Sequence, residues 1–580
     1  MPSTYKTPGV YVEEIPKFPP SVAEVETAIP VFVGFTQKAD RVIVSDLSQK
    51  PFRITSFLEY VKYYGEAKPQ AMEITIDAAN EPLIAAAPAP TKYLMYYALR
   101  SFFDNGGGPC YIFSVGTYPS ADPTNTNLYD DSAATSALNQ VKKVDEITLL
   151  VFPDLACLSE DNFYAVYKKS LMQCGDLKDR FTIMDVYPKL TGGDLDMDLS
   201  VNTFRDKIGT TELKFGAAYF PNLKSTFNYT FLNSDVTLKQ AGTPGTLDGL
   251  KFSDSVGLLK ANSLGAVISG AIEGTTAENK NDRLNLINSS WAEMKATNSD
   301  ATVTAAMEAA IASVVTDLGG ADAVKAATKT ALNKAVGDFK DKINDGVKAA
   351  ATNAPAKTNN TAANVTLLGG IVTDAFQAKV NGVIAKLYVE LPPSASMAGI
   401  YAYVDSTRGV WKAPANVSVQ STIEPVFRVS DAEQAGLNVS DTGKSINVIR
   451  TFTGRGVQVW GARTLAGNDN EWRYVSVRRF FNMAEESVKK ASEPFVFEPN
   501  DANTWVKVKA MIENFLILQW RAGALAGAKP EHAFYVACGL NQTMTALDIL
   551  EGRMIIEIGM AVVRPAEFII LRFSHKMQES

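Results

Sequence analysis

The stretch Ile147-Thr148-Leu149-Leu150-Val151-Phe152-Pro153 decides the fold class of this 580-residue chain. It is a short, nearly unbroken apolar run, which is typical of a strand buried on both faces in a parallel sheet. A helical pattern follows at Asp161 to Cys174, and a second apolar run follows that helix at Phe181 to Val186. Strand, helix and strand in this order indicate a βαβ unit. We therefore predict an α/β arrangement for residues 120–225.

The same alternation extends toward the N-terminus. The glycine-rich stretch from Asp104 to Pro109 separates a predicted helix from a predicted strand. Together, the patterns predict strands at 29–35, 110–115 and 215–220, and helices at 55–64 and 92–103.

The composition changes sharply in the middle of the chain. Between Ser253 and Leu387 only three aromatic residues occur, whereas alanine dominates. Two alanine-rich helices are expected at 300–318 and 321–351, because alanine favours helices but buries little area. We interpret residues 226–389 as an inserted, peripheral domain. Solvated helical decoration without specific chemistry is the alternative.

Aromatic residues return after Leu391. Five of the six tryptophans lie in this final third, and residues 504–525 show the three-four spacing of an amphipathic helix. This concentration of large apolar residues predicts that residues 391–580 form the main core. The expected fold class is therefore α+β with several domains: a core domain from the N-terminal arm plus the C-terminal third, an α/β middle domain, and a helical alanine-rich insertion.

Both ends of the chain carry strand-forming segments. Thr7 to Pro16 holds Val10, Tyr11, Val12 and Glu13, and Ala566 to Phe573 holds Phe568, Ile569, Ile570, Leu571 and Phe573. A terminal strand offers unpaired N–H and C=O groups, so it needs a partner. We interpret the two segments as linking strands of a protein that joins copies of itself.

Composition and charge exclude several function classes. The net charge of −7 argues against broad nucleic-acid binding, which requires a basic surface. The four cysteines form no CxxC pair and are expected to be reduced and buried. No signal peptide and no membrane-spanning run are visible.

A search for catalytic and ligand-binding motifs gives no candidate. His532 and His575 are the only histidines, so the usual catalytic bases and zinc ligands are missing. The run Gly106 to Gly108 follows a helix, the reverse of a phosphate-binding loop, and the acidic run Asp194 to Asp198 lacks the glycine and glutamate of a calcium loop. We expect no enzyme, no cofactor and no metal. An enzyme with an unrecognised site around Asp154 or Asp185 is an alternative.

Five stretches carry a family likeness. In chain order they are Thr7 to Glu14, Arg408-Gly409-Val410-Trp411-Lys412-Ala413-Pro414-Ala415-Asn416, Val459 to Leu465, Tyr474 to Arg479, and Val563-Arg564-Pro565-Ala566-Glu567-Phe568. Together they resemble contractile phage tail sheath proteins, a family shared by phage tails and phage-tail-like injection particles. The likeness covers residues 1 to about 225 and 390–580.

The resemblance implies a structural subunit that polymerises as stacked hexameric rings around an inner tube. The lattice would contract to drive the tube through a target envelope. Terminal arms of neighbouring copies would complete a sheet in each adjacent copy. The implied division is a linking arm at 1–28, an α/β sheath domain at 29–225, the insertion at 226–389, a sheath core domain at 390–565 and a linking strand at 566–580.

The resemblance also implies partners and a location. The partners are further copies of the chain, the inner tube protein, and baseplate and terminator or cap proteins, with no nucleic acid and no membrane insertion. Assembly would occur in the bacterial cytoplasm, as part of a phage tail or a phage-tail-like particle. The runner-up function is a non-contractile shell or surface-layer subunit that exchanges arms in the same way.

Basic residues of the 474–490 segment and of the predicted 504–525 helix are candidates to contact the inner tube. They are Arg478, Arg479, Lys489, Lys490, Lys507 and Arg521. Lys507 and Arg521 recur at seven-residue spacing with Asn514 between them, which places them on one helix face. Ordinary solvated charge or pairing within the chain is the alternative for each of them.

Overall fold

A computed structural model of the protein describes residues 22–77, 82–87, 90–119, 126–127, 129–232, 235–240 and 374–572, with scattered positions between 282 and 330. The chain forms two compact units. Unit 1 comprises residues 1–66, 93–224 and 391–580, and unit 2 comprises residues 67–92 and 225–390. Residues 67–92, which the sequence pattern places with the α/β domain, thus group with residues 225–390.

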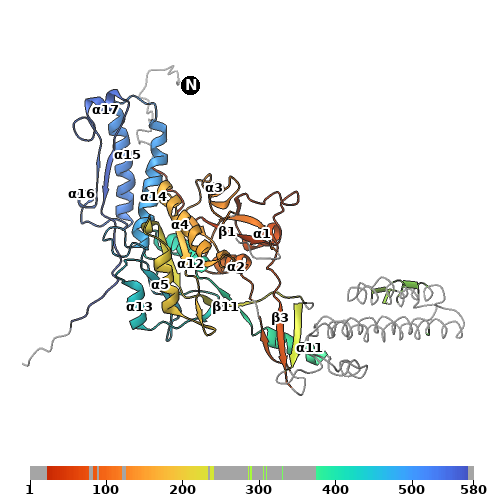
Figure 1. Ribbon diagram of the computed structural model, residues 1–580. Helices are drawn as coiled ribbons and strands as arrows, with labels where there is room; N and C mark the ends of the chain where they lie inside the picture. The colour runs from red at the N-terminus through yellow and green to blue at the C-terminus, as the bar shows by residue number, and fades with distance from the viewer. Residues whose placement is uncertain are drawn as a thin grey trace, which may run out of the picture. The chain divides into compact units, whose positions relative to one another are not determined.

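An eight-stranded sheet forms the centre of unit 1 (Figure 1). Its order is β16-β15-β10-β7-β6-β1-β5-β2, parallel from β15 to β5, with an antiparallel strand at either edge. The strands are β1 Pro30–Thr36, β2 Phe52–Ile54, β5 Cys110–Thr117, β6 Leu149–Val151, β7 Phe181–Asp185, β10 Gly216–Phe220, β15 Ile446–Phe452 and β16 Gly456–Val459. The predicted buried parallel strands, including the opening stretch, are confirmed.

Helices pack against both faces of this sheet. Successive residues of β1 belong to different apolar clusters, with Val31 and Val33 in one and Phe32 in the other, because side chains alternate along a strand. The cluster of Phe32 includes α1 Phe57–Tyr64, α2 Met95–Asp104 and α12 Ser394–Arg408. The other includes α3 Ala137–Val141, α4 Glu160–Leu177, α5 Met197–Lys207 and α13 Asp431–Asn438.

The position of the core corrects the prediction for residues 391–580. The two large clusters are built mostly from strands and helices before residue 225, completed by α12, α13, β15 and β16. Tryptophan content misled the prediction, because Trp411, Trp460, Trp472, Trp505 and Trp520 are all partly exposed. Tyrosine and phenylalanine fill the interior instead.

Two long helices dominate the last part of unit 1 (Figure 1). They are α14 Val475–Ser492 and α15 Ala502–Arg521, joined through the short turn η4 Glu493–Phe495. Phe480 and Met483 of α14 share an apolar cluster with Met511 and Phe515 of α15. The helix predicted at 504–525 is therefore confirmed. Beyond it follow α16 Pro530–Ala533, β17 Phe534–Ala537, α17 Ala546–Leu550 and β18 Glu557–Met560.

Unit 2 contains a small sheet and one described helix. Strand β3 Met72–Ile76 lies between β12 Val236–Gln240, which is parallel to it, and β4 Pro82–Ala86, which is antiparallel. The helix is α11 Asp374–Ile384. The predicted alanine-rich helices at 300–318 and 321–351 lie outside the continuous described ranges.

The remaining short elements connect the larger ones. They are β8 Leu190–Thr191, β9 Asp194–Leu195, β11 Leu223–Asn228, β13 Tyr388–Leu391, β14 Thr422–Pro425, η1 Leu155–Cys157 and η2 Leu213–Phe215. Among the described residues, no helix has both the length and the apolar content to cross a membrane.

Two buried aspartates join the elements of unit 1. Asp154 accepts backbone N–H bonds from Phe35 at 2.7 Å, Leu94 at 2.6 Å and Met95 at 2.9 Å. Asp185 accepts from the backbone N–H and the hydroxyl of Ser394, at the start of α12. Burial raises the pKa of both carboxyls to about 7, although these hydrogen bonds oppose the rise. The contacts give both residues a structural role, so they lend no support to the enzyme alternative.

We predict that Asp154→Ala lowers the free energy of unfolding by about 3 kcal/mol or more, because three buried N–H donors lose their acceptor. Urea denaturation measures this change. The control is Asp176→Ala, an exposed position on α4, where the expected change is within about 0.5 kcal/mol. Equal effects of the two substitutions would contradict the structural role of Asp154.

Candidate functional site

The carboxylate of Glu567 accepts hydrogen bonds from Arg463, Asn438 and Tyr474, and we call this set of contacts the clamp. Glu567 is where the exposed C-terminal segment begins, and we call this position the root of that segment. The guanidinium of Arg463 donates to both of its oxygens, with Nε–Oε1 at 2.9 Å and Nη2–Oε2 at 2.6 Å. Asn438 donates to Oε1 at 2.7 Å, and the Tyr474 hydroxyl donates to Oε2 at 3.2 Å. Burial acts to raise the pKa of Glu567, but the hydrogen bonds from Arg463 and Asn438 outweigh it and hold the pKa below its usual range.

Arg463 is buried, and its backbone is fixed by the edge of the main sheet. Asn447 of β15 accepts from the N–H of Arg463 at 2.7 Å and donates to its carbonyl at 2.8 Å. A Cβ at Gly461 would lie 2.8 Å from the side-chain oxygen of Asn447, so this close approach requires glycine. The strand, the glycine and the asparagine thus fix the backbone of Arg463 in a position from which its side chain reaches Glu567.

A cavity of about 610 Å³ adjoins the clamp. Four of the five stretches that carry the family likeness line it, because Arg408 to Asn416, Trp460 to Ala462, Tyr474 and Val563 to Glu567 all contribute. These stretches are far apart in the sequence. The fold brings them together around the root of the C-terminal segment.

Beyond the clamp the chain is exposed. Phe568, Ile569, Ile570 and Leu571 have exposed fractions of 69%, 79%, 77% and 72%. The predicted strand at 566–573 is not formed within this chain, as residues 566–572 have no strand pairing among the described residues. Phe573 lies outside them. We call residues 568–573 the C-terminal arm.

A second clamp holds the N-terminal side. The guanidinium of Arg479 pairs with both oxygens of Asp405, at 2.9 Å and 2.5 Å, and donates to the carbonyl of Thr27 at 2.9 Å. The Thr27 hydroxyl donates to the same carboxylate at 2.6 Å. Arg479 also lies over the ring of Tyr401, 4.6 Å from its centroid. Residues Val10 to Glu13, the predicted N-terminal linking strand, lie outside the described residues.

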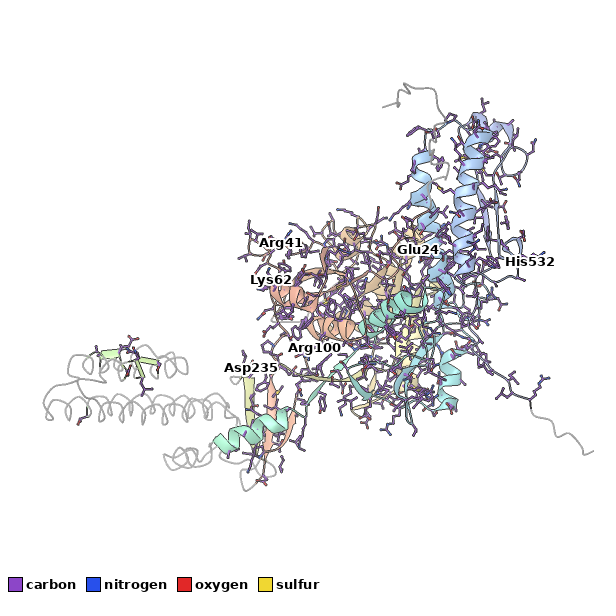
Figure 2. The ribbon with its side chains drawn as sticks, turned by 180° about the vertical axis from the view of Figure 1, so that it is seen from behind. Glu24, Arg41, Lys62, Arg100, Asp235 and His532 are labelled. Atoms are coloured by element: carbon purple, nitrogen blue, oxygen red, sulfur yellow. The ribbon has the colours of Figure 1, made fainter. Side chains whose placement is uncertain are left out.

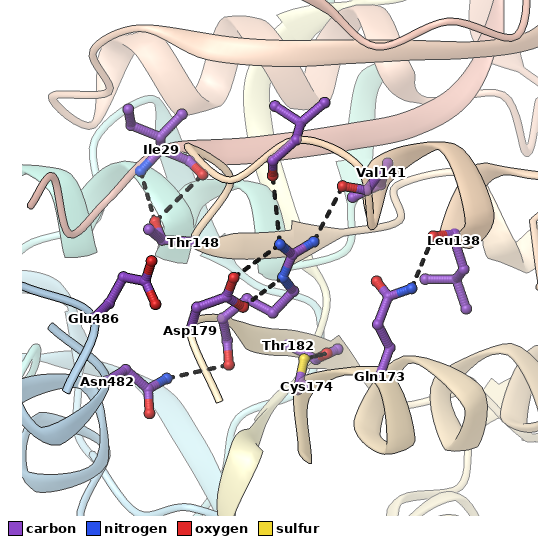
Figure 3. A network of polar contacts seen from close by, with 12 residues as sticks. Ile29, Leu138, Val141, Thr148, Gln173, Cys174, Asp179, Thr182, Asn482 and Glu486 are labelled. Carbon is purple, nitrogen blue, oxygen red and sulfur yellow. Dashed lines mark hydrogen bonds and ion pairs between the residues drawn. The ribbon is translucent and has the colours of Figure 1, made fainter. Parts of the chain in front are cut away.

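Further contacts bind residues 22–29 to the body of unit 1. Val22 is buried in the cluster of α14 and α15. Val25 donates its N–H to Ser487 on α14. Ile29 donates its N–H to Thr148, as Figure 3 shows. Figure 3 also shows Asn482 of α14, which donates to the carbonyl of Arg180. Helix α14 therefore ties the N-terminal segment to the main sheet.

Strands β17 and β18 form a separate antiparallel pair. Each has one edge without a strand partner among the described residues. After β18 the chain continues past Leu525, which bridges to Val562, and then reaches the clamp. His532 lies beside this pair and is exposed (Figure 2).

Two of the predicted tube-contact residues are in the interior, and this corrects their assignment as surface groups. Arg478 and Arg479 are 3% and 4% exposed. Arg478 pairs with Glu485 and stacks on Trp472 at 4.1 Å, whereas Arg479 forms the second clamp. Arg478 and Arg479 are therefore paired within the chain, which was the alternative considered for each of them. Both side chains are buried because the face of α14 that carries them packs toward the sheet and toward residues 22–29.

The other four basic candidates have different surroundings. Lys489 and Lys490 both pair with Glu486 on α14. Lys507 and Arg521 are exposed, as is Asn514 between them, so the predicted stripe on α15 faces outward. Their contact with a tube stays a prediction. Among the described residues, no group of three or more His, Cys, Asp or Glu is placed to hold a metal ion.

Sequence reasoning missed both clamps and the β17–β18 pair. Arg463, Tyr474 and Glu567 stood inside the quoted stretches, and charged residues within otherwise apolar stretches were the available signal. Asp405 gave no signal, because its partners Thr27 and Arg479 lie 378 and 74 positions away from it in the sequence.

Comparison with known proteins gives consistent matches. The model of the phage tail sheath protein central domain matches residues 294–465, and that of the phage tail sheath C-terminal domain matches residues 467–576. A protein described as a prophage major tail sheath protein, from Pseudomonas aeruginosa (strain UCBPP-PA14), is 27% identical over 119 residues. That match spans 20% of this chain and only 30% of the relative's length.

Solved structures match over almost the whole chain. The contracted helical sheath of the anti-feeding prophage is 27% identical with a TM-score of 0.54, covering 99% of this chain and 100% of that one. The sheath complex of the extracellular contractile injection system PVC, also contracted, is 25% identical with a TM-score of 0.54, covering 99% of each chain. A chain of the anti-feeding prophage baseplate is 26% identical with a TM-score of 0.53, covering 99% and 100%.

We predict that Arg463→Ala releases the C-terminal segment. Loss of a bidentate, charge-assisted pair costs about 2 kcal/mol, so cleavage by chymotrypsin at Phe568 should speed up roughly tenfold to thirtyfold. Arg572→Ala, an exposed position on the same segment, is the control and should leave the rate unchanged. Equal rates in all three proteins would show that Arg463 does not hold the root.

Acid should have the same effect in the wild-type protein. The clamp lowers the pKa of Glu567 in the folded state, so its stabilisation is present above the unfolded value of about 4.3 and is lost as the pH falls through the folded value. The cleavage rate at Phe568, measured with an acid-active protease, should therefore rise below about pH 4. A Glu567→Gln variant should lack this rise.

Proposed function

This chain belongs to the phage tail sheath proteins, and from that premise we propose that it is the polymerising subunit of a contractile sheath. Copies stack as hexameric rings around an inner tube, and contraction of the lattice drives the tube through a target envelope. The observation that supports this best is the exposed apolar arm at Phe568 to Leu571, held at a clamped root.

The arm is costly to leave in water. Complete burial of a large apolar side chain is worth about 1.5–3 kcal/mol, so covering even two of the four side chains contributes roughly 3–6 kcal/mol. Main-chain hydrogen bonds to a neighbouring strand add to this. A second copy that offers a strand edge therefore gains a firm link from this short segment.

The β17–β18 pair is our candidate for that acceptor. It offers two free strand edges among the described residues, and the chain has two arms to donate, Val10 to Glu13 and the C-terminal arm. Two added strands would complete a four-stranded sheet, which is stable where an isolated pair is marginal. Donation from one copy to the next is a head-to-tail contact, which builds open helical assemblies.

Contraction then follows from where the chain is fixed and where it is free. The clamp at Glu567 and the contacts of residues 22–29 fix both ends of the body, so we assign the bending between copies to the linking strands. Strand links keep neighbours joined while the bodies rotate and make new side contacts. The free energy is stored in the extended lattice and released along many copies.

The remaining assignments complete the proposal. The exposed stripe of Lys507 and Arg521 on α15 faces the inner tube through weak polar contacts, which suit a tube that must slide. The eight-stranded sheet of unit 1 is the core of the sheath subunit, and unit 2 is its insertion. The chain assembles in the bacterial cytoplasm with tube, baseplate and terminator or cap proteins.

We predict that a chain ending at Glu567 keeps its fold but no longer forms tubes. It retains the clamp and loses the arm, so its unfolding midpoint should stay within a few degrees of the wild-type value. Electron microscopy and sedimentation measure the assembly. A chain ending at Phe573 keeps the whole apolar run and should assemble normally. Normal tubes from the shorter chain would contradict the proposal.

Electron microscopy also separates the two functions considered. A contractile sheath has a long, narrow lattice on the tube and a short, wide one after triggering, whereas a non-contractile shell has one lattice. A single lattice under every condition that releases the tube would favour the shell.

We predict that Lys507→Glu with Arg521→Glu weakens binding of the inner tube without affecting the formation of sheath alone. Reversing two exposed charges should reduce co-sedimentation with the tube protein roughly tenfold at low salt, and less at high salt. Lys142→Glu with Lys143→Glu makes the same charge change at exposed positions beyond the end of α3. An equal loss in this control would remove α15 from the tube interface.

A further inference from the structure

The cavity beside Glu567 carries unpaired positive charge. Arg408, Lys412 and Arg564 line it, and none of the three forms an ion pair among the described residues. The one carboxylate that lines it, Glu567, is already held by Arg463. All three side chains are exposed, and their positive charges contrast with the net charge of −7 of the whole chain.

The wall of the cavity also contains an unused donor. The indole Nε1 of Trp411 is buried and has no hydrogen-bond partner among the described residues. A buried donor without an acceptor costs free energy. With Trp460 and Tyr474 also lining the cavity, the site suits a carboxylate-bearing segment with apolar neighbours.

The place of the cavity relative to β18 narrows the choice of ligand. After β18, Val562 forms an antiparallel bridge to Leu525, which extends the strand pairing of β18. Two residues later the chain reaches Arg564, which lines the cavity. A strand added along this edge and running on would bring the residues that follow it to the cavity. The ligand should therefore be an apolar strand followed closely by acidic residues.

The N-terminal arm has this pattern, with Val10-Tyr11-Val12 followed by Glu13 and Glu14. We propose that the cavity is a carboxylate seat for Glu13 and Glu14 of a second copy. Because successive side chains of a strand point to opposite sides, two adjacent glutamates present one carboxylate to the cavity whichever face the strand shows. The inference rests on the proposed function, since it assumes that arms pass between copies.

Charge reversal tests the seat. The pocket variant carries Lys412→Glu and Arg564→Glu, and the arm variant carries Glu13→Lys and Glu14→Lys. Each alone brings like charges together and should reduce the yield of sedimenting tubes at least roughly tenfold at low salt. The Lys142→Glu, Lys143→Glu control should assemble like the wild type. Wild-type assembly by either variant would overturn the proposal.

A mixture of the two defective variants identifies the second copy. In an equal mixture, each reversed arm meets a reversed pocket on its neighbour, so tubes should return to within about threefold of the wild-type yield. A chain carrying all four substitutions should also recover. If that chain recovers and the mixture does not, the seat takes the arm of the same copy and the proposal is wrong.

A binding measurement keeps this inference separate from the proposed function. A fluorescent peptide of residues 7–18 is titrated against the wild-type chain and the pocket variant at concentrations below assembly. The variant should bind it at least tenfold more weakly, and a peptide with lysine at positions 13 and 14 should reverse that order. An unchanged order would overturn the seat even if tubes form. Absence of tubes alone would count against the proposed function.

Discussion

The bidentate pairing of a buried arginine with a carboxylate is the interaction on which the rest of this structure depends. It occurs at Arg463 with Glu567 and again at Arg479 with Asp405, where Thr27 joins it. A guanidinium presents parallel N–H donors, so such a pair fixes direction as well as distance. The first clamp holds the chain where the C-terminal segment leaves the body, and the second helps to hold residues 22–29 against it. The exposed arm then becomes the part left to bind another copy.

Helix α14 links these clamps to the core. Its first residue, Val475, donates its N–H to Ala462, beside Arg463, and its next turns carry Arg479 and Asn482. Ser487 then accepts from Val25. One helix therefore joins the sheet edge, the residues next to the C-terminal clamp and the N-terminal segment.

The sequence was sufficient for elements whose pattern is local. Short apolar runs such as Leu149–Val151 and the spacing of α15 predicted strands and a helix that the structure contains. Pairings between distant residues were not predictable in this way. Arg478 and Arg479 read as surface charge, because nothing in the neighbouring sequence shows that α14 turns them inward. The tryptophan content likewise indicated that residues 391–580 form the main core, but the tryptophan rings of this region are partly exposed.

The family likeness lay in stretches whose purpose only the structure shows. Four of them meet at one cavity around the clamp, although each alone reads as an ordinary loop or helix start. Their shared position explains why charged and aromatic residues occur together in them. The β17–β18 pair gave no comparable signal, since two four-residue strands are too short for a clear alternation.

Amide hydrogen exchange in the free and assembled chain tests the central claim most directly. The account predicts that residues 568–571 exchange freely in the free chain and become protected on assembly, together with the outer edges of β17 and β18. The amides of Arg463, Thr464 and Leu465, which donate to Asn447, Arg473 and Gly216, should be protected in both states. Free exchange at 568–571 in assembled tubes, or loss of protection around Arg463, would contradict arms that bind a neighbour from a fixed root.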